Sequence, residues 1–137
     1  INNNLNATFH SNKFFLDNFC LNEIINDEKL IINFSSINSK GVCGQAAYSS
    51  GKSAIETFSK VLSQELGFLK IRVACIAPGY FDLASTNKNL SKNNKASIIN
   101  ETPLRRFGKI KELIKAINFI ISNKFFNGKT LKIDGGL

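Results

Sequence analysis

Two short apolar runs, LIINFSS at residues 30–36 and IRVACIAPG at residues 71–79, have the length and composition of buried β-strands. The intervening residues 46–69 follow a helical pattern, with apolar side chains at Ile55, Phe58, Leu62, Leu66 and Leu69. Parallel strands need a crossover connection, and a strand–helix–strand order of this kind supplies one. These residues therefore predict an α/β fold built on a parallel sheet.

The segments on either side continue the alternation. We expect helices at residues 4–20 and 110–121, the second with a clear core-facing stripe, and a third strand at residues 130–134, TLKID. Residues 80–103 are rich in Asn, Ser and Lys, and we expect a long loop with at most a short helix near 94–100. A three-stranded parallel sheet is small, and its strands are apolar throughout. We therefore expect neighbouring strands that this chain does not supply.

The length and composition fit one partial domain, residues 1–137. The chain has 43% hydrophobic residues, begins with Ile1 and contains no methionine, so we expect it to be an internal piece of a longer protein. No apolar run approaches the ~20 residues that cross a bilayer, and we expect no membrane partner. The spacing of Cys20, Cys43 and Cys75 matches no metal site or disulfide framework, which favours reduced thiols in a cytoplasmic protein and no bound metal.

The net charge of +8 is compatible with a nucleic-acid partner, because basic side chains neutralise phosphates. However, lysine supplies 15 of the 18 basic residues and is scattered along the chain. Asn, Ile and Phe are also abundant, and all four residue types have AT-rich codons, which explains the excess without a basic partner. We therefore expect solvated charges, Arg72 among them, and no nucleic acid.

Tyr48 and Lys52 are the residues whose spacing suggests chemistry. They lie four apart at the start of the predicted helix and so share one of its faces. A tyrosine ionises near pH ~10, and a neighbouring ammonium favours the phenolate, which lets the hydroxyl act as an acid or base. Ser35 and Ser36 end the preceding strand, at the edge where open α/β sheets bind ligands. On spacing alone, a surface tyrosine beside an exposed lysine is the simpler interpretation.

Five motifs taken together indicate a protein family more specifically than the Tyr48–Lys52 pair does. In order they are IINFSS (31–36), YSSGK (48–52), IAPGY (76–80), TPLRRFG (102–108) and GKTLKIDGGL (128–137). Their order resembles the C-terminal half of a short-chain dehydrogenase/reductase, most closely the bacterial members that include 3-oxoacyl-carrier-protein reductases. The resemblance implies a Rossmann-like, doubly wound parallel sheet, of which this chain holds the last three strands and their helices. The glycine-rich phosphate turn and the residue that separates NAD from NADP lie outside it.

The resemblance implies an NAD(P)-dependent oxidoreductase in which Ser36 orients a carbonyl and Tyr48 exchanges a proton with its oxygen. Lys52 would favour the phenolate and hold the nicotinamide ribose, and Asn4 would anchor a water that passes protons to Lys52. Ser36 precedes Tyr48 by 12 positions, one fewer than is commonest in the family, so Ser35 remains an alternative. Asn4 also has an alternative role, as a helix cap in an Asn-rich segment.

The same resemblance assigns cofactor contacts to Tyr48, Lys52, Pro78, Gly79 and Phe81. Leu83 stands where the family often has a threonine that bonds the cofactor amide, and Ser85 or Thr86 is a candidate to replace it. The cofactor would be NAD or NADP, which this half of the family's fold does not distinguish. The missing phosphate turn implies that activity belongs to the full-length protein.

The resemblance further implies a small-molecule or acyl-thioester carbonyl substrate and a cytoplasmic homotetramer, whose subunits meet through helices matching residues 4–20 and 46–69. Two alternatives come from other classes of protein. One is a non-catalytic interaction module derived from a degenerate half-domain. The other is a small basic nucleic-acid-binding protein.

Overall fold

The computed structural model describes residues 2–19, 28–83 and 90–137. The elements in chain order are α1 (Asn2–Phe19), β1 (Lys29–Phe34), η1 (Ile37–Lys40), α2 (Ala46–Leu66), η2 (Gly67–Leu69), β2 (Ile71–Pro78), α4 (Lys92–Glu101), α5 (Ile110–Ser122) and β3 (Thr130–Ile133), where η marks a 3-10 helix. Each predicted strand and helix is therefore present. The last turn of the predicted helix 46–69 tightens into η2 from Gly67 onward.

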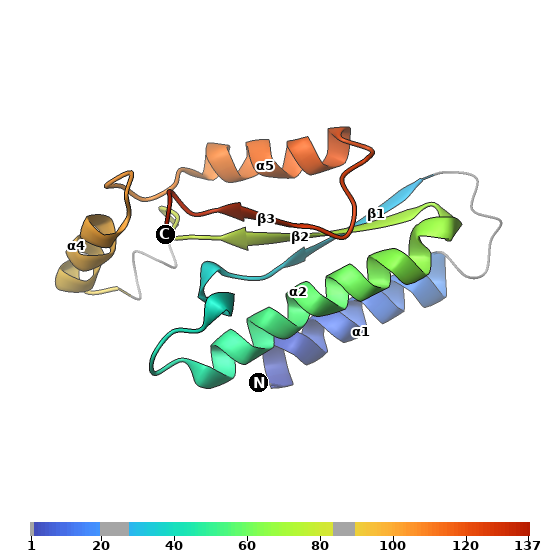
Figure 1. Cartoon of the computed structure of the whole chain (residues 1–137), viewed down its shortest axis with the longest axis horizontal. Helices are drawn as coiled ribbons and strands as arrows, with labels where there is room; N and C mark the ends of the chain where they lie inside the picture. Colours follow the sequence, from blue (N-terminus) through green and yellow to red (C-terminus); the bar gives the residue numbers. More distant parts are fainter. Residues whose placement is uncertain (1, 20–27, 84–89) are drawn as a thin grey trace.

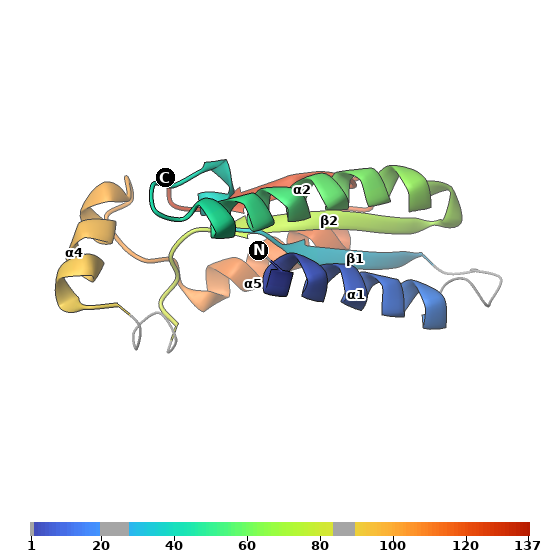
Figure 2. The ribbon, with the colours of Figure 1, turned by 90° about the horizontal axis from the view of Figure 1, so that it is seen from below.

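The three strands form one parallel sheet in the order β1-β2-β3. β1 and β2 pair in register from Lys29 opposite Ile71 to Phe34 opposite Ile76. Figure 1 shows α1 and α2 on one face of this sheet and α5 on the other, and Figure 2 shows α1 and α2 running side by side. The predicted doubly wound, Rossmann-like α/β arrangement is confirmed. The central strand β2 is buried along its length up to Pro78.

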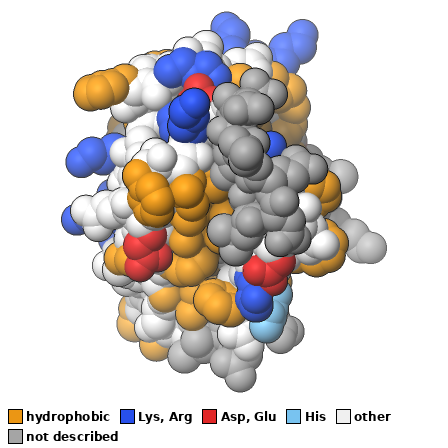
Figure 3. Space-filling view, turned by 90° about the vertical axis from the view of Figure 1, so that its right-hand side faces the viewer, with side chains coloured by type: hydrophobic (Ala, Val, Ile, Leu, Met, Phe, Trp, Pro, Cys, Tyr) orange, Lys and Arg blue, Asp and Glu red, His pale blue; other side chains and the backbone are white. Residues whose placement is uncertain are grey.

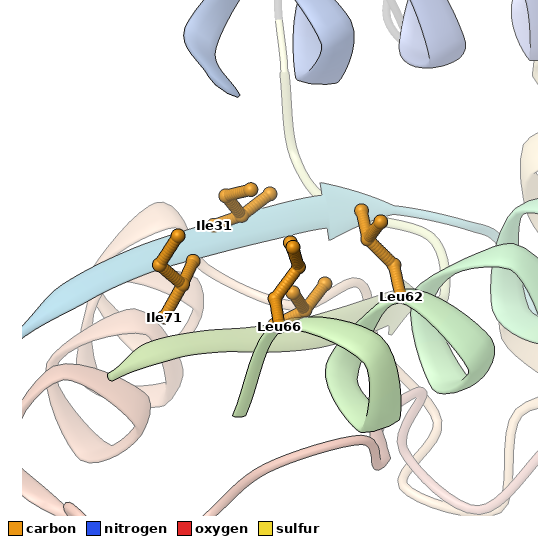
Figure 4. Close-up of a cluster of buried hydrophobic side chains, with 5 residues drawn as sticks. Ile31, Leu62, Leu66 and Ile71 are labelled. Carbon is orange, nitrogen blue, oxygen red and sulfur yellow. The ribbon is translucent and has the colours of Figure 1, made fainter. Parts of the chain in front are cut away.

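The core beneath α1 and α2 comes from the apolar periodicity of α2. Leu62 and Leu66 lie one turn apart and point into the same cluster as Ile31 of β1 and Ile71 of β2 (Figure 4). Val73 completes the buried part of this cluster, and Phe15, Leu16, Phe58 and Leu69 pack around it. Full burial of one such side chain contributes about 1.5–3 kcal/mol, so this contact fixes α2 on the sheet.

The opposite face of the sheet is covered by α5, but only by one side of that helix. Ile120 is buried against Ala74 and Ile76 of β2. Ile114 and Ile121, which lie on the other side of α5, are each 48% exposed. The expected core stripe of this helix is therefore only partly buried.

Arg72 joins the start of β2 to the end of α5. The residue is 7% exposed, and its guanidinium lies within hydrogen-bond distance of the backbone carbonyls of Ile120, Ile121, Asn123 and Phe126, three of which share the two hydrogens of Nη1. It also pairs with Glu28, which in turn contacts Lys124. The expected solvation of Arg72 is wrong, because the open carbonyls at a helix C-terminus attract a cationic donor. Figure 3 views this end of the molecule, where acidic and basic side chains lie beside each other.

The segment after β2 is more helical than expected. α4 spans Lys92–Glu101, and the Ser91 hydroxyl accepts a hydrogen bond from Asn94 N at its start. In Figure 1 this helix lies apart from the sheet, at the end where the strands terminate. No helix in the described ranges is long and apolar enough to cross a membrane.

Candidate active site

The candidate site lies where the carboxyl ends of β1 and β2 meet, at the left of Figure 1. An open cleft of about 540 Å³ occupies this end of the sheet, and its lining includes Ser35, Ser36, Gln45, Tyr48, Pro78 and Gly79. The serines follow β1, Pro78 ends β2, and Tyr48 lies in the first turn of α2. The parallel topology therefore brings residues from three separate segments to one place, as the sequence predicted for this edge.

The two serines play different structural parts. Both serines are buried, and the Ser35 hydroxyl lies 2.7 Å from Glu56 Oε1 and 2.9 Å from Lys52 O, both on α2. Ser36 begins η1, and its Oγ accepts a hydrogen bond from Asn38 N at 3.2 Å. A hydroxyl that accepts through a lone pair can still donate its proton, so Ser36 Oγ is suited to donate to a carbonyl oxygen. Both serines line the cleft, but the Ser35 hydroxyl is directed to acceptors on α2, and the assignment of Ser36 as the serine that meets a substrate stays a prediction.

Tyr48 and Lys52 lie on one face of α2, as their spacing predicted. Tyr48 is 40% exposed in the cleft, and Lys52 Nζ lies 5.8 Å from the centroid of its ring. Lys52 Nζ also donates to the carbonyl of Phe34 at 3.0 Å, which anchors it to the end of β1. This contact keeps a positive charge beside the tyrosine ring.

Asn4 belongs to a second cleft next to the first. This cleft, of about 350 Å³, is lined by Asn4, Thr8, Asn12, Asn33 and Lys52, among others. Lys52 therefore borders the Asn4 side, while its neighbour Tyr48 borders the larger cleft. Asn4 and Lys52 thus line the same cleft, and the water relay between them stays a prediction.

Gly79 brings backbone directly to the edge of the larger cleft. A Cβ at this position would lie 2.7 Å from Asp134 Cα, closer than any side chain could be accommodated. Gly79 N donates to Ile133 O at 2.8 Å, which holds the turn against β3. The Pro78–Gly79 backbone thus lies at the edge of the cleft, held against β3, and its contact with a cofactor stays a prediction.

The structure places Phe81 differently from the other predicted cofactor residues. Its side chain is 4% exposed, stacks over Gly108 and lines a separate cavity of about 110 Å³. Any contact of Phe81 with a cofactor would therefore come from its backbone, and its role stays a prediction. Ser85 and Thr86, the candidate replacements for a threonine at Leu83, lie outside the described residues.

The small cavity also borders an ion pair. Arg106 Nη1 and Nη2 lie 2.8 and 2.6 Å from the two carboxylate oxygens of Glu112, and these bonds lower the pKa of Glu112 to about 2.

Elsewhere, burial raises the pKa of the Cys75 thiol, and the charge of Glu56 raises it further. Cys43 and Cys75 are both free thiols. The described part of the chain holds no group of three His, Cys, Asp or Glu residues that could bind a metal ion.

Sequence reasoning missed several residues of this region. Tyr80 and Leu90 also line the larger cleft. Tyr80 had a signal, as the last residue of the IAPGY motif, but nothing in the local pattern of Leu90 indicated it. Glu56 had a usable signal, because it follows Lys52 by the same four residues that separate Lys52 from Tyr48. Asn33 had another, as a polar side chain inside an apolar strand.

Fold and site define a class: a parallel α/β domain with serine, tyrosine and lysine gathered at the carboxyl ends of its strands. A family model described as enoyl-(acyl carrier protein) reductase matches residues 4–137. The 3-oxoacyl-[acyl-carrier-protein] reductase of Chlamydia muridarum is 43% identical over 110 residues, which cover 78% of this chain and 44% of that protein. The chain belongs to the short-chain dehydrogenase/reductase family.

Solved structures agree with this assignment. A short-chain dehydrogenase/reductase from Brucella melitensis superposes with a TM-score of 0.80 at 28% identity, covering 97% of this chain and 52% of that one. A 4-hydroxyisoleucine dehydrogenase mutant complexed with NADH and succinate gives a TM-score of 0.84 at 27% identity, covering 97% and 55%. The chain spans about half the length of the curated relatives it matches.

Proposed function

We propose that this chain is the catalytic and C-terminal part of an NAD(P)-dependent oxidoreductase that interconverts a carbonyl and a secondary alcohol. The observation that carries the proposal is the arrangement of Ser36 and Tyr48 around one cleft, with Lys52 Nζ 5.8 Å from the tyrosine ring. Family membership and the presence of all three residues favour an enzyme over a non-catalytic module or a nucleic-acid-binding protein.

The residues present fit a nicotinamide cofactor. The Pro78–Gly79 backbone lines the larger cleft, and Lys52, which borders the neighbouring cleft, offers an ammonium suited to ribose hydroxyls. Bound there, the nicotinamide would supply or accept the hydride. The relative solved with NADH supports this choice of cofactor, and NADP is equally compatible with these residues.

The chain's own residues would handle the carbonyl and its proton. Ser36 Oγ would donate a hydrogen bond to the carbonyl oxygen and orient it. Tyr48 would protonate that oxygen during reduction, or remove the proton from an alcohol in the reverse direction. Lys52 would stabilise the phenolate that remains, and a water held near Asn4 would return a proton through Lys52.

We infer the substrate and assembly from the relatives and from the surface. The match to a 3-oxoacyl-[acyl-carrier-protein] reductase supports a small-molecule or acyl-thioester ketone. Phe9, Phe14 and Phe19 of α1 are each at least 46% exposed, which supports subunit contacts through α1 and α2 in a homotetramer. We also propose a cytoplasmic location, consistent with the free thiols of Cys43 and Cys75.

The test is a Tyr48→Phe variant of the complete protein, assayed for NAD(P)H-dependent reduction of acyl-thioester, sugar and steroid ketones. We expect turnover to fall by about 10²–10⁴-fold, because the proton donor is lost while the ring and its packing remain. Cofactor binding, followed by fluorescence, should persist. Ser53→Ala, an exposed change on the same helix, serves as the control. Turnover by Tyr48→Phe at the rate of the control would refute the assignment.

A further inference from the structure

Glu56 lies on α2 one turn beyond Lys52 and two turns beyond Tyr48. Residues separated by four and eight positions share a helix face, so the carboxylate extends the face that carries the tyrosine and the lysine. The proposed chemistry assigns this carboxylate no role. Its contacts, however, lead directly to the turn that carries Ser36.

One oxygen of Glu56 accepts hydrogen bonds from serines on both sides of Ser36. Ser35 Oγ donates to Glu56 Oε1 over 2.7 Å, and Ser39 Oγ donates to the same oxygen. Ser35 follows the end of β1, and Ser39 lies within η1. The carboxylate therefore ties both ends of the short turn to α2, with Ser36 held between the two attachment points.

The turn also has internal bonds, which make it a compact unit. Ser36 Oγ accepts from Asn38 N at 3.2 Å, and Ser36 O accepts from Ser39 N at 3.0 Å. These bonds set the shape of the turn, but they do not set its position relative to α2. Neutral bonds also join the turn to α2, from Ser35 Oγ to Lys52 O and from Asn38 Nδ2 to Gln45 at the start of the helix. The Glu56 contacts add a charged acceptor, and bonds to a charged acceptor are stronger than bonds between neutral groups.

We propose that Glu56 is a positioning residue that fixes the Ser36 hydroxyl relative to Tyr48 by holding residues 35–39 against α2. This inference rests on the proposed function, because it assigns Glu56 a part in the same reaction. Tyr48 and Glu56 belong to one rigid helix, so a turn held by Glu56 keeps a constant distance from the tyrosine hydroxyl. A displacement of about 1 Å between such groups can cost about 100-fold in rate.

The test compares Glu56→Leu with Glu56→Gln in the complete protein. The two side chains have similar size, but only glutamine offers an oxygen that accepts hydroxyl hydrogen bonds. For Glu56→Leu we expect kcat to fall by about 10- to 100-fold and KM to change by less than about threefold. For Glu56→Gln we expect kcat within about threefold of the unmodified protein.

A second measurement is independent of activity. Hydrogen exchange of the backbone amides of residues 37–41 should accelerate in Glu56→Leu and remain slow in Glu56→Gln. Gly128→Ala provides a control for stability, because it perturbs the opposite end of α2 and lies outside the site. It should lower Tm and leave kcat unchanged.

The inference is overturned if Glu56→Leu retains its kcat, if Glu56→Gln is as impaired as Glu56→Leu, or if Gly128→Ala loses a similar share of kcat. A retained kcat in Glu56→Leu would deny Glu56 a positioning role. Equal impairment of Glu56→Gln would assign the loss of kcat to the missing charge. A similar loss of kcat in Gly128→Ala would assign that loss to lower stability of the fold. A complete protein with no reductase activity would instead refute the proposed function, whereas an active protein whose Glu56→Leu variant keeps its kcat refutes only the role of Glu56.

Discussion

Replacing Arg72 by methionine should destabilise the protein severely without touching the candidate site. The guanidinium is buried and serves four carbonyls, those of Ile120, Ile121, Asn123 and Phe126, at distances of 3.0–3.4 Å. It also pairs with Glu28. Methionine keeps most of the apolar volume of the arginine stem, so the variant isolates the loss of the guanidinium.

The magnitude follows from these contacts. A hydrogen bond to a charged donor contributes about 1.5–3 kcal/mol. Four independent bonds would therefore stabilise the fold by more free energy than the replacement of one residue usually costs. The carbonyls share one guanidinium, and water can reach those of the exposed Ile121 and Asn123, so their contributions do not add. Breaking a buried charged network typically costs about 3–5 kcal/mol. We expect a loss in this range for Arg72→Met.

Urea unfolding followed by circular dichroism measures this loss in the complete protein. Arg72→Lys is the matched control, because it keeps the charge opposite Glu28 but has only three donors on a single nitrogen. We expect the lysine variant to lose about half as much free energy of unfolding as the methionine variant. A loss below about 1 kcal/mol for Arg72→Met would show that the network does not stabilise the end of α5.

Three further predictions concern other parts of the fold. Gly128→Ala should lower the free energy of unfolding by about 2 kcal/mol or more in thermal melts, because φ is +64° and a Cβ would clash with a serine hydroxyl of α2. Glu112, whose pKa falls from 4.5 to about 2 beside Arg106, should stabilise the fold above pH 4.5, and this should be lost as pH falls toward 2. An acid titration of Arg106→Gln should show a smaller loss, because only the Lys109 N–H still donates to the Glu112 carboxylate. Asn33→Ala removes the buried hydrogen bonds to Asn12 and should cost about 1–3 kcal/mol in urea unfolding, whereas an unchanged midpoint would contradict the network.

The parts of the fold that the sequence predicts well are those set by local periodicity. β1, α2 and β2 follow directly from two apolar runs and one helical stripe, and their alternation dictates a parallel sheet. That Tyr48 and Lys52 lie on one face of α2 follows from helical spacing alone. Because parallel strands end at one edge of the sheet, the placement of Ser36 beside Tyr48 was also predictable.

The parts that the sequence did not predict depend on contacts between distant segments. Arg72 looked like any solvated charge, and only the position of the α5 C-terminus, about 50 residues later, shows why it is buried. Phe81 follows the Pro–Gly turn, yet its side chain packs over Gly108 of another segment. Ile114 and Ile121 belong to the apolar stripe of α5, yet each is 48% exposed, which the periodicity of the helix does not reveal.

The two ends of the sheet use hydrogen bonds for different purposes. At the amino end, Arg72 and Glu28 neutralise each other and satisfy open carbonyls, so a change there should alter stability and spare the reaction. At the carboxyl end, Lys52 and Glu56 anchor the end of β1 and the turn after it, while the hydroxyls of Tyr48 and Ser36 border an open cleft. Tyr48 is 40% exposed, so the loss of its hydroxyl should reduce kcat far more than the free energy of unfolding. For variants at each end of the sheet, the change in kcat can be compared with the change in free energy of unfolding. This comparison separates residues that stabilise the fold from residues that act on a substrate.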